Sequence, residues 1–377
     1  DGAVGSAVNG ALGAISINSA ATLQADSTVE AASFSQTNGS ALTQFDGTVT
    51  LSGLFNFTGT ALTLNASGNT IGGTMDVTNS GVFTTADIAD LTVTGKLTQD
   101  GTSTSSIGAD ITATAGMDFG KAILLTGTDL ITFATGGATD QDIVLGTDAS
   151  TDITGAGRAL TLDAGAAGDI TIEGDMGADG AALGAITISN ADQVLFDETV
   201  TAASFTQSLA NTTKGLTTFD GTVDLTGAFA FTGRALTMNA AGNTVGGTMD
   251  VTNSGVFTTA DSADFTVTGD FKQLGGGTTT LGDDLISTTG LVTLTTAVTL
   301  DSTDTVRVQS GGGSGDNVAF LSSITRNNGE SLILDAGTGG NIQAVGEVNL
   351  GAGNLEIDDA VNAFFSNQIT AGKFTQH

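Results

Sequence analysis

Apolar residues alternate with polar or small residues along most of the chain, at a spacing of two. The clearest examples are Val49, Leu51, Phe55 and Phe57, and again Val223, Leu225, Phe229 and Phe231. Successive side chains of a β-strand point to opposite faces, so this spacing predicts strands with one buried face. Helical periodicity is nowhere persuasive. We therefore expect an all-β protein whose inward-facing Phe residues form the core.

Short polar segments interrupt these strands. They read Thr-Gly, Asn-Ala-x-Gly-Asn and Asn-Ser-Gly, and each recurs in corresponding places along the chain. Gly and Asn tolerate the positive φ that many tight turns require. The sequence therefore predicts many short strands joined by turns rich in Gly, Asn and Asp.

The chain contains a long internal repeat, which is best identified before any fold is assigned. The segment Thr74–Asp87 recurs identically as Thr248–Asp261. We place the repeats at about 2–173 and 174–345, with a partial third copy over 346–377. The chain starts and stops inside a repeat and shows no capping segment. We therefore expect a window onto a longer array, or a subunit whose ends dock onto the next subunit.

Two all-β architectures fit many short strands with Gly-rich turns. Immunoglobulin-like sandwiches usually contain a buried Trp, a corner Tyr and turn prolines, and this chain has no Trp, Tyr or Pro. In a parallel β-helix each strand pairs above and below, so proline would remove a ladder hydrogen bond at almost any position. Stacked Asn, Thr, Ser and Phe side chains also form ladders there.

We therefore expect residues 1–377 to form one continuous all-β fold, a single-stranded, right-handed parallel β-helix (β-solenoid) with Gly/Asn/Asp-rich turns. At about 20 residues per coil the chain makes about 19 coils, a rod of roughly 90 Å at a strand spacing of about 4.8 Å.

Three motifs carry a resemblance to a known family. They are Ala159–Ile172, Ala182–Asn190 and Phe219–Gly227. They resemble the large repetitive β-strand surface proteins of bacteria, of the filamentous-haemagglutinin-like adhesin type, and the resemblance covers essentially the whole chain. It implies a β-solenoid, secretion to the surface or outside of a Gram-negative-type cell, and a structural or adhesive role.

Composition excludes several classes of protein. The 377 residues include 9 Lys and Arg against 40 Asp and Glu, for a formal net charge of −31. The few basic residues are scattered, so we predict no nucleic-acid partner, which would require clustered Lys and Arg. No run approaches the roughly 18 apolar residues that a membrane-spanning helix needs, and we predict no membrane insertion by a helix. The absence of Cys excludes disulfides and thiolate chemistry.

The sequence contains no recognisable set of catalytic residues. The sole histidine is the terminal His377, which excludes Ser-His-Asp triads and His-ligated metal clusters. Three pairs of neighbouring acids are candidates for a polysaccharide hydrolase: Asp283-Asp284, Asp358-Asp359 and Asp197-Glu198. Neighbours on a strand point to opposite faces, so such pairs do not converge on one bond. We therefore predict no catalytic residue, no cofactor-binding residue and no enzyme.

Calcium is the ion that the composition favours, since Asp supplies the hard oxygen ligands that Ca²⁺ prefers. The candidate ligands are Asp87 with Asp90, repeated as Asp261 with Asp264. The competing interpretation is that these are acids in solvated turns. Chelation by EDTA should distinguish the two, because a bound ion that matters would cost folding or bundling when it is removed.

The function that these observations favour is a structural segment of an extracellular bacterial filament or surface fibre, built from stacked coils that associate end to end. Net charge opposes side-by-side contact, so salt or divalent cations should promote bundling. One alternative is an adhesin stalk that binds a host, a surface or a glycan, for which the divergent stretch Leu291–Asn328 is the nearest candidate patch. A polysaccharide-active β-helix enzyme is a further alternative.

Overall fold

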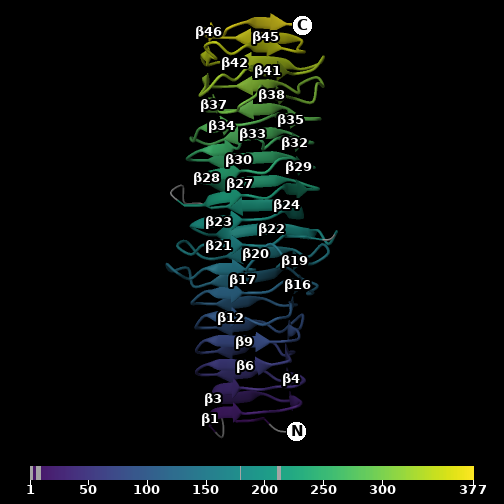
Figure 1. Cartoon of the computed structure of the whole chain (residues 1–377), viewed down its shortest axis with the longest axis vertical. Coiled ribbons are helices and arrows are strands. Elements are labelled where there is room, and N and C mark those ends of the chain that lie inside the picture. The colour runs from purple at the N-terminus through teal and green to yellow at the C-terminus, as the bar shows by residue number, and fades with distance from the viewer. Residues whose placement is uncertain (1–2, 6–9, 179, 210–213) are drawn as a thin grey trace. The chain divides into compact units, whose positions relative to one another are not determined.

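The computed structural model describes residues 3–5, 10–178, 180–209 and 214–377. They form an all-β parallel β-solenoid of about 17 coils, a coil being one complete winding of the chain, with no helix among them. The chain divides into two compact units, Asp1–Glu198 and Thr199–His377, and each is described by itself. Within each unit the strands stack on one another in chain order (Figure 1).

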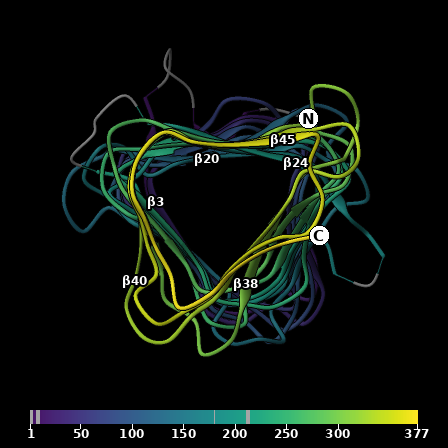
Figure 2. The ribbon, with the colours of Figure 1, turned by 90° about the horizontal axis from the view of Figure 1, so that it is seen from above.

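Each coil passes in turn through a first, a second and a third face, which form the sides of a triangle when a unit is viewed along its stacking direction (Figure 2). A strand on one face pairs in parallel with the strand of the same face in the next coil, most often three elements later. The register keeps like positions together. Phe55 pairs with Met75, Met75 with Leu97, and Leu97 with Met117, so inward-facing residues form a continuous column.

In unit 1, β1 (Leu12–Ile17) pairs with β3 (Val29–Gln36), and β3 pairs with strands of both the first and the second face. The first face holds β5 (Val49–Leu51), β8 (Asn69–Ile71), β11 (Leu91–Val93), β14 (Ile111–Ala113), β17 (Ile131–Thr135), β20 (Leu160–Asp163) and β22 (Leu183–Asn190). The second holds β6 (Phe55–Gly59), β9 (Met75–Asn79), β12 (Leu97–Gln99), β15 (Met117–Phe119), β18 (Ile143–Leu145), β21 (Ile170–Ile172) and β23 (Gln193–Phe196). The third holds β2 (Leu23–Ala25), β4 (Leu42–Phe45), β7 (Ala61–Leu64), β10 (Phe83–Thr85), β13 (Ser105–Ile107), β16 (Ile123–Leu125) and β19 (Ile153–Thr154).

Unit 2 repeats this plan, and its first strand, β24 (Val200–Ser208), again pairs with two faces. The first face holds β26 (Val223–Leu225), β29 (Asn243–Val245), β32 (Phe265–Val267), β35 (Leu285–Ser287), β38 (Val306–Gln309), β41 (Leu332–Asp335), β44 (Leu355–Ile357) and β47 (Phe374–Gln376). The second holds β27 (Phe229–Gly233), β30 (Met249–Asn253), β33 (Phe271–Leu274), β36 (Val292–Leu294), β39 (Val318–Phe320), β42 (Asn341–Ala344) and β45 (Asn362–Phe365). The third holds β25 (Leu216–Phe219), β28 (Ala235–Met238), β31 (Phe257–Thr259), β34 (Thr279–Leu281), β37 (Val298–Leu300), β40 (Ile324–Arg326), β43 (Val348–Asn349) and β46 (Ile369–Thr370).

Coil length varies more than the sequence indicated. On the third face of unit 1, Ser105 pairs with Ile123 and Ile123 pairs with Ile153, so the second of these two coils is much longer than the first. The number of coils, about 17, is therefore lower than the roughly 19 that 20 residues per coil would give. Longer corners between strands, such as those between β16 and β19, use more residues per coil and reduce the number of coils to about 17.

The core consists of the inward side chains of the three faces, as the alternating pattern predicts. Its largest fully buried side chains are Phe residues, which hold equivalent places in the two units. In unit 1 the ring of Phe55 stacks on Phe34, with centroids 4.9 Å apart, and meets the edge of Phe45. Phe229 makes the same contacts with Phe205, at 5.0 Å, and Phe219. The prediction that these Phe residues are core is confirmed, because all six rings are buried.

Two kinds of glycine occupy the corners. Gly68 and Gly242, in the Asn-Ala-x-Gly-Asn turns, have φ of 73° and 75°, as expected. The glycines of Thr-Gly and Asn-Ser-Gly, Gly59 and Gly81, do not have a positive φ. A Cβ on Gly59 would instead lie 2.7 Å from the ring of Phe57, and one on Gly81 would lie 3.0 Å from a backbone oxygen of the preceding coil. Gly59, at the end of β6, therefore leaves room for a side chain of its own strand, whereas Gly81 allows the backbone of the preceding coil to approach closely.

Candidate functional site

Asp87, the first calcium candidate, lies in the corner that follows β10. The tight turn is closed by the amide of Ala89, which donates to the carbonyl of Ala86 at 2.9 Å. The Asp87 carboxylate accepts two hydrogen bonds from Thr128, at 2.6 Å from its backbone N and at 2.7 Å from its hydroxyl. Thr128 follows β16, two coils further on, because β10 pairs with β13 and β13 with β16. Asp87 therefore links two coils that are not adjacent.

Gly108, in the corner after β13, lies between the two ends of this link. A Cβ at Gly108 would lie 2.9 Å from the backbone N of Asp87, and a Cβ at Gly127 would lie 3.1 Å from the Asp87 carboxylate. The link therefore requires small residues in the corner that it crosses. We call the arrangement of Asp87, Gly108 and Thr128 the two-coil staple.

Unit 2 contains a second two-coil staple at the repeat-related position. The Asp261 carboxylate accepts hydrogen bonds from the backbone N of Thr303 at 2.6 Å, from its hydroxyl at 2.8 Å, and from the hydroxyl of Ser302 at 3.0 Å. The residue in the crossed corner is again a glycine, Gly282, whose added Cβ would lie 2.4 Å from the backbone of Ala260. The staple is therefore part of the repeat, although its partner residues differ.

The hydrogen bonds of the staples hold both carboxylates in the charged form. For Asp87 the hydroxyl and then the amide of Thr128 lower the pKa below its ordinary value. For Asp261 the amide of Thr303 is the largest cause of the lowered pKa, followed by the hydroxyls of Thr303 and Ser302. Thr128 in unit 1, and Ser302 and Thr303 in unit 2, therefore donate hydrogen bonds to the carboxylates that the sequence suggested as calcium ligands.

The partner acids of the two calcium candidates lie close to the staples. Asp264 accepts a hydrogen bond from the backbone N of Gly242 at 2.6 Å. Asp87 and Asp90 line one surface hollow of about 450 Å³ together with Ser67, Ile88, Gly108, Ala109, Asp110, Asp129 and Leu130. Within the part of the chain that the structure describes, no three His, Cys, Asp or Glu residues are arranged to hold a metal ion. The calcium assignment stays a prediction.

The corner after β34 in unit 2 contains one more acid than the equivalent corner after β13 in unit 1. Asp283 stands in unit 2 at the repeat position that Ala109 occupies in unit 1. Burial raises the pKa of Asp283, and the charges of Asp284, Asp264 and Asp261 raise it further, against a hydrogen bond from the backbone of Asp284 that lowers it. Asp284 itself accepts a hydrogen bond from the backbone N of Arg307 at 2.7 Å. This pair, a hydrolase candidate in the sequence, therefore lies in a corner where its carboxylates meet backbone groups.

Asp358, from a second candidate pair, and other acids of unit 2 also have structural partners. Asp358 and Asp335 both bind the guanidinium of Arg307, with N–O distances of 3.0 Å. Asp316, in the Gly-Gly-Ser-Gly-Asp segment, accepts a hydrogen bond from the backbone N of Gly313 at 2.8 Å. His377 lies 3.1 Å from a carboxylate oxygen of Glu356.

A groove on the second face of unit 2 was not located from sequence, although part of it lies in the divergent stretch Leu291–Asn328. It has a volume of about 530 Å³ and crosses β36, β39, β42 and β45. Its lining residues are Leu291, Thr293, Asn317, Ala319, Asn341, Gln343, Asn362 and Phe364. Strand register places Thr293, Ala319, Gln343 and Phe364 in one outward column. The column could not be assembled from sequence because its members lie in successive coils of unequal length.

A ladder of amides runs beside this column. The side-chain oxygen of Asn317 accepts hydrogen bonds from the backbone N of Asn341 at 2.8 Å and from its side-chain amide at 3.1 Å. The side-chain oxygen of Asn341 accepts one from Asn362 at 2.9 Å. The three Asn side chains are thereby fixed in successive coils.

The equivalent ladder of unit 1 is acidic. There Asp142 accepts a hydrogen bond from the backbone N of Asp169 at 2.8 Å, and Asp169 accepts one from the backbone N of Gln193 at 3.0 Å. Both ladders place a side-chain oxygen on the backbone N of the next coil, but carboxylates in unit 1 are replaced by amides in unit 2. The groove of unit 2 therefore lacks the negative charge that its counterpart carries.

The chain matches no family model, no curated protein and no solved structure. The fold alone defines its class, a parallel β-solenoid repeat protein. The resemblance to bacterial surface proteins of the filamentous-haemagglutinin-like type is therefore supported at the level of the β-solenoid and its repeats. No helix in the described part of the chain has the length and apolar character needed to cross a membrane.

Proposed function

We propose that the chain is a structural segment of an extracellular bacterial filament or surface fibre, in which stacked β-solenoid coils associate end to end. The observation that carries this proposal is the in-register stacking of core positions in successive coils, where Phe55 pairs with Met75, Met75 with Leu97 and Leu97 with Met117, because such a stack can be continued by a further coil in the same register. Core positions also remain apolar in the first and last described coils. Phe34 and Phe374 hold the same place in the repeat, paired with Ile15 and Leu355. Phe34 is 2% exposed, whereas Phe374 is 49% exposed.

The difference between these two Phe residues has a simple cause. In unit 1 the next coil places Phe55 on the ring of Phe34. No ring occupies the corresponding place on Phe374 in the described part of unit 2. An additional coil stacked on β47 would bury Phe374, and burial of one Phe side chain stabilises a contact by about 1.5–3 kcal/mol.

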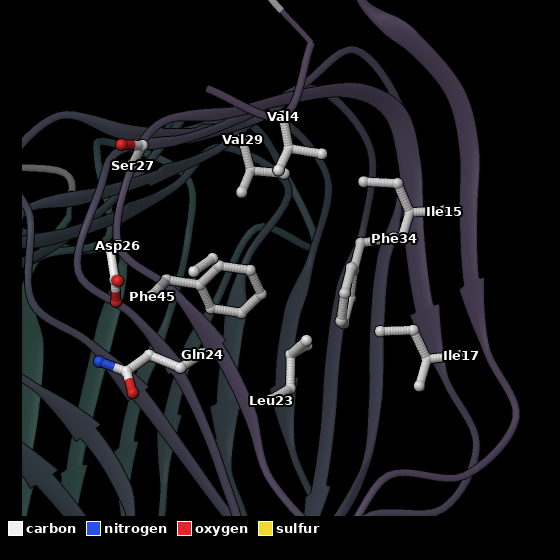
Figure 3. A pocket seen from close by; sticks show the side chains of 11 residues that line it. Val4, Ile15, Ile17, Leu23, Gln24, Asp26, Ser27, Val29, Phe34 and Phe45 are labelled. Atoms are coloured by element: carbon white, nitrogen blue, oxygen red, sulfur yellow. The ribbon is translucent and has the colours of Figure 1, made fainter. Parts of the chain in front are cut away.

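The outermost coil of unit 1 shows the same property. Leu12 is 45% exposed, and its repeat equivalent Leu183 is 1% exposed. A pocket of about 240 Å³ opens into the core there, between apolar side chains that include Ile15, Ile17 and Leu23 (Figure 3). The backbone N–H and C=O groups of strand β1 can also form hydrogen bonds with a further parallel strand. In the proposal, end-to-end association covers surfaces of this kind with a further coil of matching register.

Sedimentation velocity over a range of protein concentrations tests this association. We expect the average mass of the wild-type chain to rise with concentration, and Phe374→Asp to reduce the rise because a carboxylate would be placed in an apolar contact. Ile88→Asp is the matched control, since Ile88 is 65% exposed on the side of unit 1. A wild-type chain that stays monomeric up to its solubility limit, or equal effects of the two substitutions, would overturn the proposal.

Location outside a Gram-negative-type cell belongs to the same proposal and is supported by the motifs that resemble secreted surface proteins. Antibody labelling of intact cells tests it, with permeabilised cells as the comparison. Labelling that requires permeabilisation would contradict an extracellular location. The second candidate function, an adhesin stalk, is favoured by the uncharged groove of unit 2.

A further inference from the structure

We infer that the groove on the second face of unit 2 binds a neutral polysaccharide, with the sugar chain lying along the stacking direction across β36, β39, β42 and β45. The groove extends to β45, beside the surface on which the proposed end-to-end contact forms, and polysaccharide binding is measured separately from self-association. The inference rests on three properties of the groove: its free amide groups, its exposed aromatic ring and its lack of charge.

The amide ladder leaves a hydrogen-bonding group free beside the outward column. The described hydrogen bonds use the side-chain oxygen of Asn317 and both amide groups of Asn341, but not the side-chain N of Asn317. Both groups of the exposed Gln343 amide are also free in the described part of the chain. Sugar hydroxyls both donate and accept, so a row of fixed donors and acceptors is suited to them.

Phe364 supplies the apolar part of the groove. It faces outward, in register with Gln343, and is 57% exposed, whereas its neighbour Phe365 faces inward. The ring is a flat apolar surface beside a row of amides, the combination that the apolar face and hydroxyl rim of a pyranose require. Successive strands are about 4.8 Å apart, close to the length of one sugar unit, so adjacent coils can contact adjacent sugars.

The absence of charge indicates which polysaccharide fits. The chain carries a net charge of −31, yet none of the residues that line the groove is charged. An acidic polysaccharide would be repelled by the protein as a whole, and a basic polymer would find more favourable sites on the acidic face of unit 1. A neutral polysaccharide avoids both effects.

Affinity electrophoresis of the full chain in gels that contain dextran, mannan, xylan or galactan, with alginate as the acidic comparison, tests this inference. We expect at least one neutral polymer to retard the wild-type chain, and alginate not to. Phe364→Ala and Gln343→Ala should each weaken the retarding interaction about tenfold. Leu195→Ala is the matched control, because Leu195 holds the equivalent outward position on β23 of unit 1.

A third variant removes the free amide donor of Asn317 without removing the oxygen that holds the ladder. Asn317→Asp keeps the oxygen that accepts from the backbone of Asn341, as Asp142 does for Asp169 in unit 1. It should weaken neutral-polymer binding about tenfold through loss of the free amide donor. The inference is overturned if no neutral polymer retards the chain, or if Leu195→Ala weakens binding as much as Phe364→Ala does. Circular dichroism of each variant shows that the β-solenoid is retained.

Discussion

At the scale of single residues, the aspartates at repeated positions stabilise the chain through hydrogen bonds that skip a coil. Asp87 and Asp261 lie in identical segments, yet their donors differ, Thr128 alone in one unit and Ser302 with Thr303 in the other. A carboxylate can accept several hydrogen bonds, so it tolerates this exchange of partners. The repeat therefore preserves the acceptor while its donors vary.

Removal of one staple should increase local opening at its far end. In Asp261→Ala we expect hydrogen exchange of the Thr303 amide at neutral pH to be faster than in the wild type, because that N–H loses its acceptor. Asp304→Ala removes a neighbouring charge and leaves the staple intact, so it should leave that exchange rate unchanged. Equal rates in the wild type and Asp261→Ala would show that the staple contributes nothing.

The staples also predict the direction of a pH effect. Folding lowers the pKa of Asp261 below its ordinary value of 3.8, so the folded chain binds fewer protons at this group than the unfolded chain does. The stabilisation is therefore fully present above pH 3.8 and is lost as the pH falls through the lower pKa of the folded chain. The chemical shift of the Thr303 amide should accordingly remain constant at neutral pH and change below pH 3.8.

At the scale of elements, short strands form regular ladders and the corners determine how closely coils approach. Gly282→Ala should destabilise unit 2 by about 1–3 kcal/mol, because the added Cβ would lie 2.4 Å from the backbone of Ala260. Gly276→Ala is the matched control, since its Cβ would contact nothing within 4 Å. Urea unfolding of both variants measures the difference. Equal midpoints would show that the corner has room for a side chain.

The strands were largely predictable from the sequence, because the alternation of apolar and polar residues defines both the strands and the face that each strand buries. Positions that differ between the copies, such as Thr50 and Asp224, lie on outward faces of β5 and β26, as the pattern required. Corner geometry was less predictable. The staple joins residues 41 positions apart, and neither local pattern nor repeat offset indicates that Asp87 meets Thr128. The amide groove likewise depends on strand register, which unequal coil lengths conceal.

At the scale of the whole molecule, net charge governs how copies meet side by side. With a net charge of −31, copies should repel one another at low salt, where the Debye length is long. We expect light scattering to rise as Mg²⁺ or Ca²⁺ is added, to rise less with NaCl at the same ionic strength, and to return to its starting value after EDTA. Scattering that stays flat throughout the divalent titration would contradict cation-mediated bundling.

The identical segments Thr74–Asp87 and Thr248–Asp261 lie in the same part of the winding, since β9 and β30 begin at equivalent methionines on the second face. Crossing-over between the two corresponding stretches of a gene would join Thr74 directly to Met249 and create no foreign junction. Apart from the two-coil staples, each winding touches those directly above and below it, and Asp261 would keep its own staple in the shortened product, so we expect equivalent contacts to form. We therefore expect such a gene to vary the length of its product by whole repeats.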